Sequence, residues 1–195
     1  ESFQSNDLNK SEFILNEILD SFPQDANSLH LLGCIHKERG QIQEALSFIQ
    51  ESIRHDNNNP ITYLNHAKIL LNLGKYENAA GVLHQSLKIN QNIPESWFCL
   101  GNALRQLDNT NEAIKCYKNV LNLKPFHSGA AANLSLLLTQ TGHKEEAESI
   151  IQHILKVNPE DVNSLINYGK LLLEQGKIDL AINQYTKAFK LGGES

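Results

Sequence analysis

The chain has 195 residues, of which 41% are hydrophobic and 20% charged, as in an ordinary globular domain. Seventeen Lys and Arg stand against 22 Asp and Glu without forming a basic cluster, which argues against a nucleic acid partner. The apolar runs are far shorter than the roughly 20 residues of a membrane-spanning helix, so we expect no membrane insertion.

Three cysteines, Cys34, Cys99 and Cys116, are too few for a disulfide framework and form no CxxC pair. We therefore expect reduced thiols and a cytoplasmic location. The chain begins at Glu1, shows no signal-peptide pattern and contains no Met. These features predict an excerpt from a longer protein.

The first predicted helix covers residues 11–22, where apolar residues recur at helical spacing before Pro23. Residues 1–9 are polar, and we expect them to be frayed. We interpret residues 1–25 as this frayed N-terminus followed by the second helix of an incomplete repeat, whose first helix is missing or degenerate.

From residue 26 onward the sequence repeats with a period of 34 residues and no insertions. The predicted repeats cover residues 26–59, 60–93, 94–127, 128–161 and 162–195. The twentieth position is always Ala, at Ala45, Ala79, Ala113, Ala147 and Ala181. Gly, or Asp108 in the third repeat, occupies the fifteenth position, where a short turn must end a helix. Each repeat is thus predicted to form a helix A, a tight turn and a helix B of similar length, with all five prolines at the junctions.

The third repeat carries a family signature, composed of Trp97, Leu100, Gly101, Leu104, Ala113, Tyr117 and Pro125. Its spacing resembles the tetratricopeptide repeat (TPR), in which W-x2-L-G-x2-Y is followed by A-x3-F and P. This resemblance implies an all-α, right-handed solenoid of antiparallel helix pairs. It also implies a module that binds proteins or peptides, although fold alone does not define a ligand.

Motifs for catalysis are absent from the sequence: there is no phosphate loop, GxSxG elbow or HExxH helix. We therefore expect no enzymatic activity and no cofactor in this chain. His30 and Cys34 lie one helical turn apart and could in principle share a metal ion. We favour a role for the pair as lining of a groove, and we expect no metal site.

In TPR arrays the A helices line a concave groove, which receives positions 2, 5, 6, 9, 12 and 13 of each repeat. The residues predicted to bind peptide there are Asn65, Lys68, Phe98, Asn102, Arg105, Asn133, Gln140, Asn163, Asn167 and Lys170. This face is Asn-rich and nearly neutral. It lacks the cations with which chaperone-binding TPR domains hold a terminal carboxylate, so we reject that mode.

Asn recurs at the sixth position, in Asn65, Asn133 and Asn167, and Asn102 follows one turn along in the third repeat. The pattern resembles the asparagine ladder of O-GlcNAc transferases, which bind extended polypeptides. One amide both accepts and donates hydrogen bonds, so it can pair with the backbone of a bound chain. Because the whole sequence is rich in Asn, a purely compositional origin stays open.

The sequence therefore predicts a non-catalytic module that binds a protein or an extended peptide. The most specific hypothesis is the substrate- or partner-recruiting region of an O-GlcNAc-transferase-like or other TPR-bearing transferase. One alternative is a scaffold that self-associates through apolar residues at its open C-terminal edge, Ile182, Tyr185 and Phe189. Another is an adaptor in secretion or pilus biogenesis.

Overall fold

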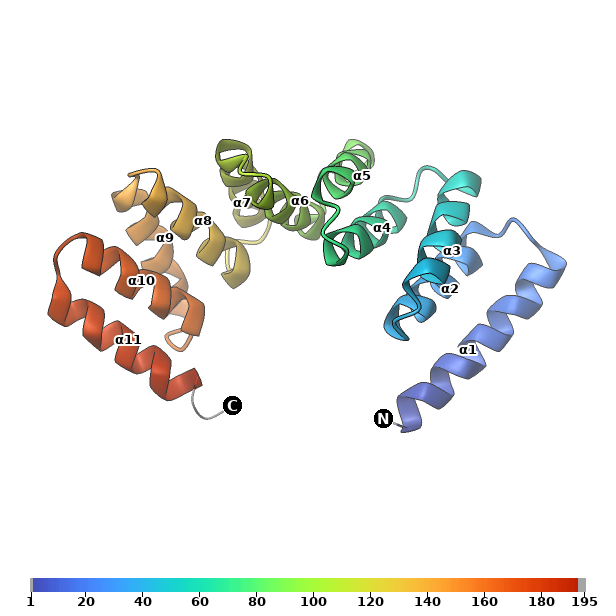
Figure 1. Ribbon diagram of the computed structural model, residues 1–195, viewed down its shortest axis with the longest axis horizontal. Helices are drawn as coiled ribbons and strands as arrows, with labels where there is room; N and C mark the ends of the chain where they lie inside the picture. Colours follow the sequence, from blue (N-terminus) through green and yellow to red (C-terminus); the bar gives the residue numbers. More distant parts are fainter. Residues whose placement is uncertain (1, 193–195) are drawn as a thin grey trace. The chain divides into compact units, whose positions relative to one another are not determined.

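The computed structural model describes residues 2–192, which form eleven α-helices and no strand (Figure 1). The helices are α1 (Ser2–Ser21), α2 (Ala26–Glu38), α3 (Ile42–His55), α4 (Pro60–Asn72), α5 (Tyr76–Ile89), α6 (Pro94–Gln106), α7 (Thr110–Leu123), α8 (Ser128–Gln140), α9 (Lys144–Val157), α10 (Val162–Glu174) and α11 (Ile178–Gly192). From α2 onward they form five pairs, in which an A helix with an even number precedes a B helix with an odd number. The A helices begin at the first residue of each 34-residue period. The predicted all-α fold of helix pairs is confirmed.

The chain divides into two compact units, one ending at Ala103 and the other beginning at Leu104. The division falls within α6. Unit 1 holds the pairs α2–α3 and α4–α5 together with α1, and unit 2 holds α7 and the pairs α8–α9 and α10–α11.

Side chains at the repeat junctions fix where the A helices begin. Asp25 accepts a hydrogen bond from the backbone N–H of Ser28 at 2.7 Å, and Asp161 accepts one from that of Ser164 at 2.9 Å. These bonds satisfy backbone donors that the first turn of a helix leaves unpaired. Hydrogen bonds from Ser28 lower the pKa of Asp25, because they favour its carboxylate form.

Each A helix ends in a turn that needs one residue with positive φ. Gly40 has φ +75°, and Asp108, at the same position of the third repeat, has φ +57°. The Gly40 and Gln41 N–H groups donate back to carbonyls of the last turn of α2, at 3.0 and 2.9 Å. Glycine adopts this left-handed conformation without the steric cost that a Cβ brings.

In unit 1, α2 packs closely against α3, and both helices contact α4. Ala45 and Ile49 of α3 are fully buried in this contact. A Cβ added to Gly33 of α2 would lie only 2.5 Å from Cγ1 of Ile49, so the helices approach as closely as glycine permits. A buried hydroxyl also joins the pair, because Ser52 Oγ donates to the carbonyl oxygen of Ala26 at 2.7 Å.

In unit 2, helix α7 buries both small and large side chains. Ala113, Tyr117 and Val120 of α7 are fully buried. Helix α8 contacts α7, α9 and α10, and α10 packs on α11. There the ring of Tyr185 occupies the space beside Gly169, at 2.9 Å from where a Cβ would stand.

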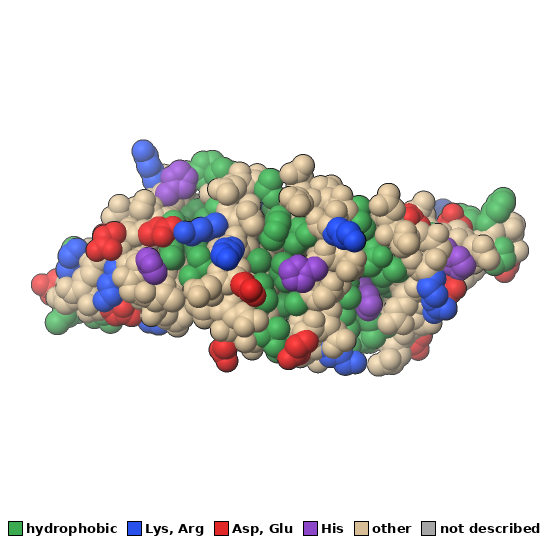
Figure 2. Space-filling model, turned by 90° about the horizontal axis from the view of Figure 1, so that it is seen from above, with side chains coloured by type: hydrophobic (Ala, Val, Ile, Leu, Met, Phe, Trp, Pro, Cys, Tyr) green, Lys and Arg blue, Asp and Glu red, His purple; other side chains and the backbone are tan. Residues whose placement is uncertain are grey.

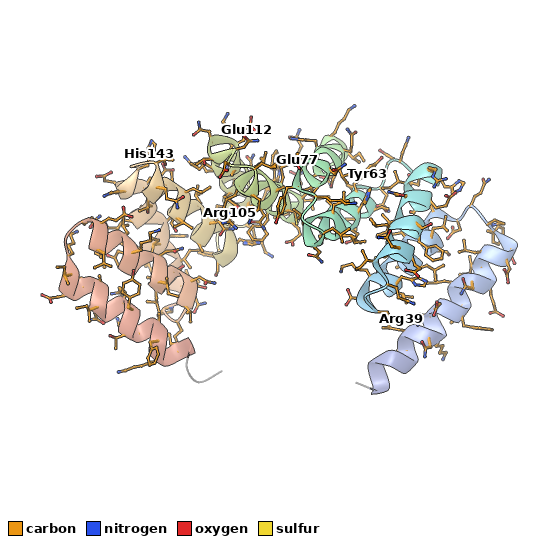
Figure 3. The ribbon with its side chains drawn as sticks, viewed as in Figure 1. Arg39, Tyr63, Glu77, Arg105, Glu112 and His143 are labelled. Atoms are coloured by element: carbon orange, nitrogen blue, oxygen red, sulfur yellow. The ribbon has the colours of Figure 1, made fainter. Side chains whose placement is uncertain are left out.

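The N-terminal segment differs from expectation, because α1 is helical from Ser2 rather than frayed up to residue 9. Residue 1 lies outside the described residues. Arg39, which follows α2 and is labelled in Figure 3, explains the order of the middle of α1. Its guanidinium donates to Oδ1 of Asn9 and to Oε2 of Glu12, each at 2.6 Å. These long-range bonds hold α1 against α2 at a stretch that is polar in sequence.

Candidate binding surface

We use the name A-helix face for the positions 2, 5, 6, 9, 12 and 13 of the A helices within each unit. All ten predicted site residues lie on A helices: Asn65 and Lys68 on α4; Phe98, Asn102 and Arg105 on α6; Asn133 and Gln140 on α8; Asn163, Asn167 and Lys170 on α10. Gln140 and Asn163 are exposed, and the other eight are half-buried. Unit 1 holds four of the ten, Asn65, Lys68, Phe98 and Asn102, and unit 2 holds the other six.

Unit 1 brings Asn65 together with two residues of the preceding A helix. Its Nδ2 donates to Nε2 of His30 at 2.7 Å and reaches Sγ of Cys34 at 3.4 Å. Burial lowers the pKa of His30, which favours the neutral imidazole that can accept this bond. The Asn65 amide therefore ties α4 to α2.

The predicted cation of unit 1 has an acidic partner. Nζ of Lys68 lies 3.4 Å from Oε1 of Glu95, which stands at the second position of the third repeat. Both side chains are partly exposed, so the pair contributes little to stability. Its effect on the A-helix face is to cancel the charge of Lys68.

Unit 2 joins two predicted residues through the buried Tyr117. Asn133 donates from Nδ2 to the Tyr117 hydroxyl at 3.3 Å, and the Arg105 side chain also hydrogen-bonds that hydroxyl. Burial raises the pKa of Tyr117 to about 12, and the Arg105 charge opposes this rise. The Nε of Arg105 is buried without a hydrogen-bond partner. The hydroxyl of the buried Tyr117 thus orients the side chains of Asn133 and Arg105.

Asn167 bonds to backbone instead of a side chain. Its Nδ2 donates to the carbonyl oxygen of Ala132 in the preceding A helix at 2.9 Å. Asn65 and Asn167 occupy the same position of the repeat, and each uses its amide to contact the A helix before it. An amide carries a second N–H and a carbonyl oxygen, so one such bond does not exhaust its capacity.

The sixth-position Asn residues were predicted only as ligand contacts, and their intramolecular bonds were not predicted from the sequence. The partners stand 35 residues before them, as with His30 and Ala132. One repeat plus one residue separates the two ends of each bond. The 34-residue period could have predicted this separation, but it could not predict the direction in which each amide points.

The three cysteines are free thiols. Burial raises the pKa of Cys99 to about 11 and that of Cys116 to about 12, and it also raises the pKa of Cys34. Protonated thiols are poor nucleophiles and poor metal ligands. Among residues 2–192, no three His, Cys, Asp or Glu side chains gather in a way that could hold a metal ion.

Positive and negative side chains are interspersed on the face of the molecule drawn in Figure 2, without a broad area of either sign. This distribution agrees with the net charge of −5 and with the absence of a basic cluster in the sequence. None of the helices described between residues 2 and 192 has the length and apolar character needed to cross a bilayer.

Comparisons with known proteins agree on the architecture. A family model for anaphase-promoting complex, cyclosome, subunit 3 matches residues 4–86, and two tetratricopeptide repeat models match residues 94–127 and 133–191. The tetratricopeptide repeat-containing protein trd-1 of Caenorhabditis elegans is 28% identical over 183 residues, or 93% of this chain. BBSome complex member BBS4 of Bos taurus is 24% identical over 89% of the chain. This chain spans only 23% and 32% of those two proteins.

Solved structures show the same fold at low sequence identity. The Pseudomonas aeruginosa pilF protein has a TM-score of 0.84 at 16% identity, covering 99% of this chain and 88% of that one. The TPR protein YrrB has a TM-score of 0.79 at 16% identity, covering 91% of each chain. The tetratricopeptide repeat models that match residues 94–127 and 133–191, together with the 34-residue period and the five helix pairs, identify the chain as a tetratricopeptide repeat protein.

Proposed function

We propose that the A-helix face of each unit binds extended polypeptide through its backbone, and that the chain acts as a non-catalytic recruiting module. The observation that carries this proposal is the paired geometry of Asn65 and Asn167. Each amide is oriented by a hydrogen bond to the preceding A helix, at 2.7 and 2.9 Å. A side chain held in one rotamer loses less entropy when it binds a ligand.

The spacing of the helices suits an extended ligand. Neighbouring packed helices lie about 8–10 Å apart, which is close to three residues of extended chain at about 3.3 Å each. An amide on each A helix could then contact one peptide unit in three. Such contacts address the backbone, so they demand little of the ligand's side chains.

The charges favour a ligand without a strong net charge. Glu95 neutralises Lys68 in unit 1, while Arg105 in unit 2 lies against the Tyr117 hydroxyl. Binding by neutral hydrogen bonds should depend only weakly on ionic strength. Two structural neighbours support peptide binding as the general mode: YrrB is described with an unusual peptide-binding site, and the first TPR domain of Spaghetti (RPAP3) was solved with an HSP90 peptide.

The test replaces Asn65, Asn102, Asn133 and Asn167 together by Ala and measures binding of unstructured peptides by fluorescence anisotropy. Each neutral hydrogen bond is worth about 0.5–1.5 kcal/mol, so the loss of four should weaken binding at least tenfold. A matched variant replaces four exposed Asn residues of B helices by Ala: Asn78, Asn111, Asn122 and Asn183. It should bind as the parent does.

Circular dichroism must show that both variants are folded at the temperature of the assay, since Asn65 and Asn167 also join helices. Equal affinity of the parent and the A-helix variant would refute the proposal. A steep loss of affinity of the parent between low and physiological salt would instead assign recognition to Arg105 and Lys170.

For the larger protein, we propose a recruiting role beside a transferase activity. The mouse Protein O-mannosyl-transferase TMTC3 is 25% identical over 166 residues, which cover 84% of this chain and 18% of that protein. The likeness to O-GlcNAc transferases rests on the sixth-position Asn residues. An adaptor role in secretion or pilus biogenesis is the alternative.

A second candidate function is self-association through the C-terminal edge. Ile182 and Phe189 of α11 are 56% and 79% exposed, and Ile178 is exposed on the same side of the helix. Tyr185 is half-buried because it packs beside Gly169, so it contributes less than the sequence predicted. Sedimentation should show concentration-dependent association that Ile182→Glu with Phe189→Glu abolishes, whereas an unchanged monomer in both proteins would exclude this edge.

A further inference from the structure

An apolar cleft of about 430 Å³ lies between α1 and α2 in unit 1. Leu8, Ile14 and Leu15 line it from α1, and Leu31 and Ile35 line it from α2. Figure 1 shows these two helices side by side at the N-terminal end of the chain. The cleft is larger than a void left by imperfect packing, and it opens to solvent.

The five complete repeats show what covers the equivalent surface elsewhere. In the 34-residue frame, Ser11 of α1 corresponds to the twentieth-position Ala residues, which are all fully buried. Ser11 itself is exposed. Ile18 corresponds to Ser52, Ser86, Val120, Ile154 and Ala188, which are all buried, yet Ile18 is 37% exposed. The helix that buries these positions in the complete repeats is the A helix of the same pair.

The wall formed by α2 also carries an apolar residue at a position that contacts the preceding A helix in a later repeat. Its sixth-position residue is Leu31, which is 50% exposed. In the next repeat the sixth position is Asn65, which contacts the preceding A helix through His30 and Cys34. The surface of α1 and α2 therefore has the form of a seat for one A helix, and it is apolar at the position where three of the four later repeats carry Asn.

The geometry of α1 keeps its own upstream chain from filling this seat by a TPR turn. The complete B helices begin at the seventeenth position, as at Ile42 and Tyr76, which corresponds to Leu8. Helix α1 is already helical from Ser2, so the residues that would form the tight turn lie inside it. A helix that fills the cleft is therefore not joined to α1 by the tight turn of a TPR pair.

We propose that the α1–α2 cleft binds a single amphipathic helix of a partner protein. The apolar face of this helix carries a small residue opposite Ser11, as Gly33 of α2 lies opposite Ala45 and Ile49. Leu or Ile on either side of that small residue fills the space above Leu15 and Leu31. The ligand is a helix in a groove, unlike the extended chain proposed for the A-helix face.

The test uses an A helix of this chain as the probe. A fluorescein-labelled peptide with the sequence of residues 60–73 is closed by a lactam on its solvent side, because so short a helix is marginal in water. Fluorescence anisotropy should show saturable binding to the intact chain. The peptide variant Ala67→Leu, which replaces the small residue at the centre of the face, should bind at least tenfold more weakly because it overpacks the seat.

Variants of the chain locate the site. Ser11→Phe fills the cleft and should abolish binding, and Leu31→Asn should weaken it by about tenfold through lost apolar contact. Leu180→Asn is the matched control, since Leu180 is 52% exposed on the B helix α11, and it should leave binding unchanged. The proposal is overturned if the parent does not bind the peptide, or if Ser11→Phe binds it as well as the parent. None of these variants touches the Asn residues of the A-helix face.

Discussion

Unit 1 and unit 2 differ at the twenty-seventh position of the repeat, where helix B meets the start of helix A. In unit 1 the position holds Ser52 and Ser86, whose hydroxyls donate to the carbonyl oxygens of Ala26 and Pro60 at 2.7 and 2.9 Å. In unit 2 it holds the apolar residues Val120, Ile154 and Ala188, which are buried without such a bond. The period thus preserves a small or medium side chain at this contact while its chemistry changes.

The sixth position varies in a similar way. Asn65 of unit 1 bonds to side chains of the preceding A helix, whereas Asn167 of unit 2 bonds to a backbone carbonyl. The result is equivalent, because both amides join successive A helices. The position in the repeat therefore determines which helices the side chain joins, whereas the local sequence determines which atom it bonds to.

The largest expected effect tests the helix contact at the twentieth position of the repeat, which occurs within each unit. Ala79→Leu in unit 1 and Ala113→Leu in unit 2 should each lower the free energy of unfolding by about 1–3 kcal/mol, because both overpack a closed helix contact. Urea denaturation measures the loss. Ser11→Leu occupies the same position in α1, where the seat is open, and should change stability by less than about 0.5 kcal/mol. An equal loss in all three variants would show that α1 is covered like the other B helices.

The next effect separates the units. Ser86→Ala in unit 1 should cost about 1 kcal/mol, since it removes the buried donor to Pro60 and the contact with Ser96 at 2.9 Å. Ser149→Ala, at an exposed serine of α9, should be neutral within about 0.5 kcal/mol. Thermal unfolding followed by circular dichroism compares them. If Ser86→Ala is as stable as the parent, the hydroxyl bridge of unit 1 is dispensable.

A smaller effect concerns the turns. Asp108→Gly should stabilise the chain by about 0.5–1 kcal/mol, because it relieves a left-handed residue at φ +57°. Gly142→Ala, at the equivalent turn with φ +84°, should destabilise it by about 1 kcal/mol. Denaturant midpoints should move in opposite directions, and a shift of both in the same direction would contradict the turn assignment.

The smallest effect is a pH dependence of unit 1. Burial lowers the pKa of His30 and of His66 below the ordinary value of 6.5. As the pH falls through 6.5 the unfolded chain therefore takes up protons before the folded chain does, and stability decreases. Replacing both by Gln should flatten this slope, whereas His143→Gln at an exposed site should not. A slope that both variants retain would have another origin.

The period of 34 residues was sufficient to predict the helix pairs and the residues at which the A helices begin. Its strongest determinants were backbone requirements, such as glycine at a positive φ and Ala45 at a close helix contact. These requirements act within one repeat, so they are visible in sequence.

The contacts that sequence could not supply depend on side-chain direction between repeats. The Arg39 bonds to Asn9 and Glu12 explain why a polar segment is helical, and they cross about 30 residues. The cleft beside Leu31 depends on how the side chains of α1 and α2 pack, which the period does not specify. The period predicts the position of each residue on its helix, but it does not predict which atoms the side chain contacts.

The most direct test of the proposed peptide binding is side-chain amide NMR of the ¹⁵N-labelled chain during titration with a mixture of unstructured 15-residue peptides. We expect the Nδ2–H₂ resonances of Asn65 and Asn167 to shift with saturation while those of Asn122 and Asn183, on B helices, stay in place. Resonances of Asn65 and Asn167 that do not move while the peptides bind would contradict the proposed peptide binding.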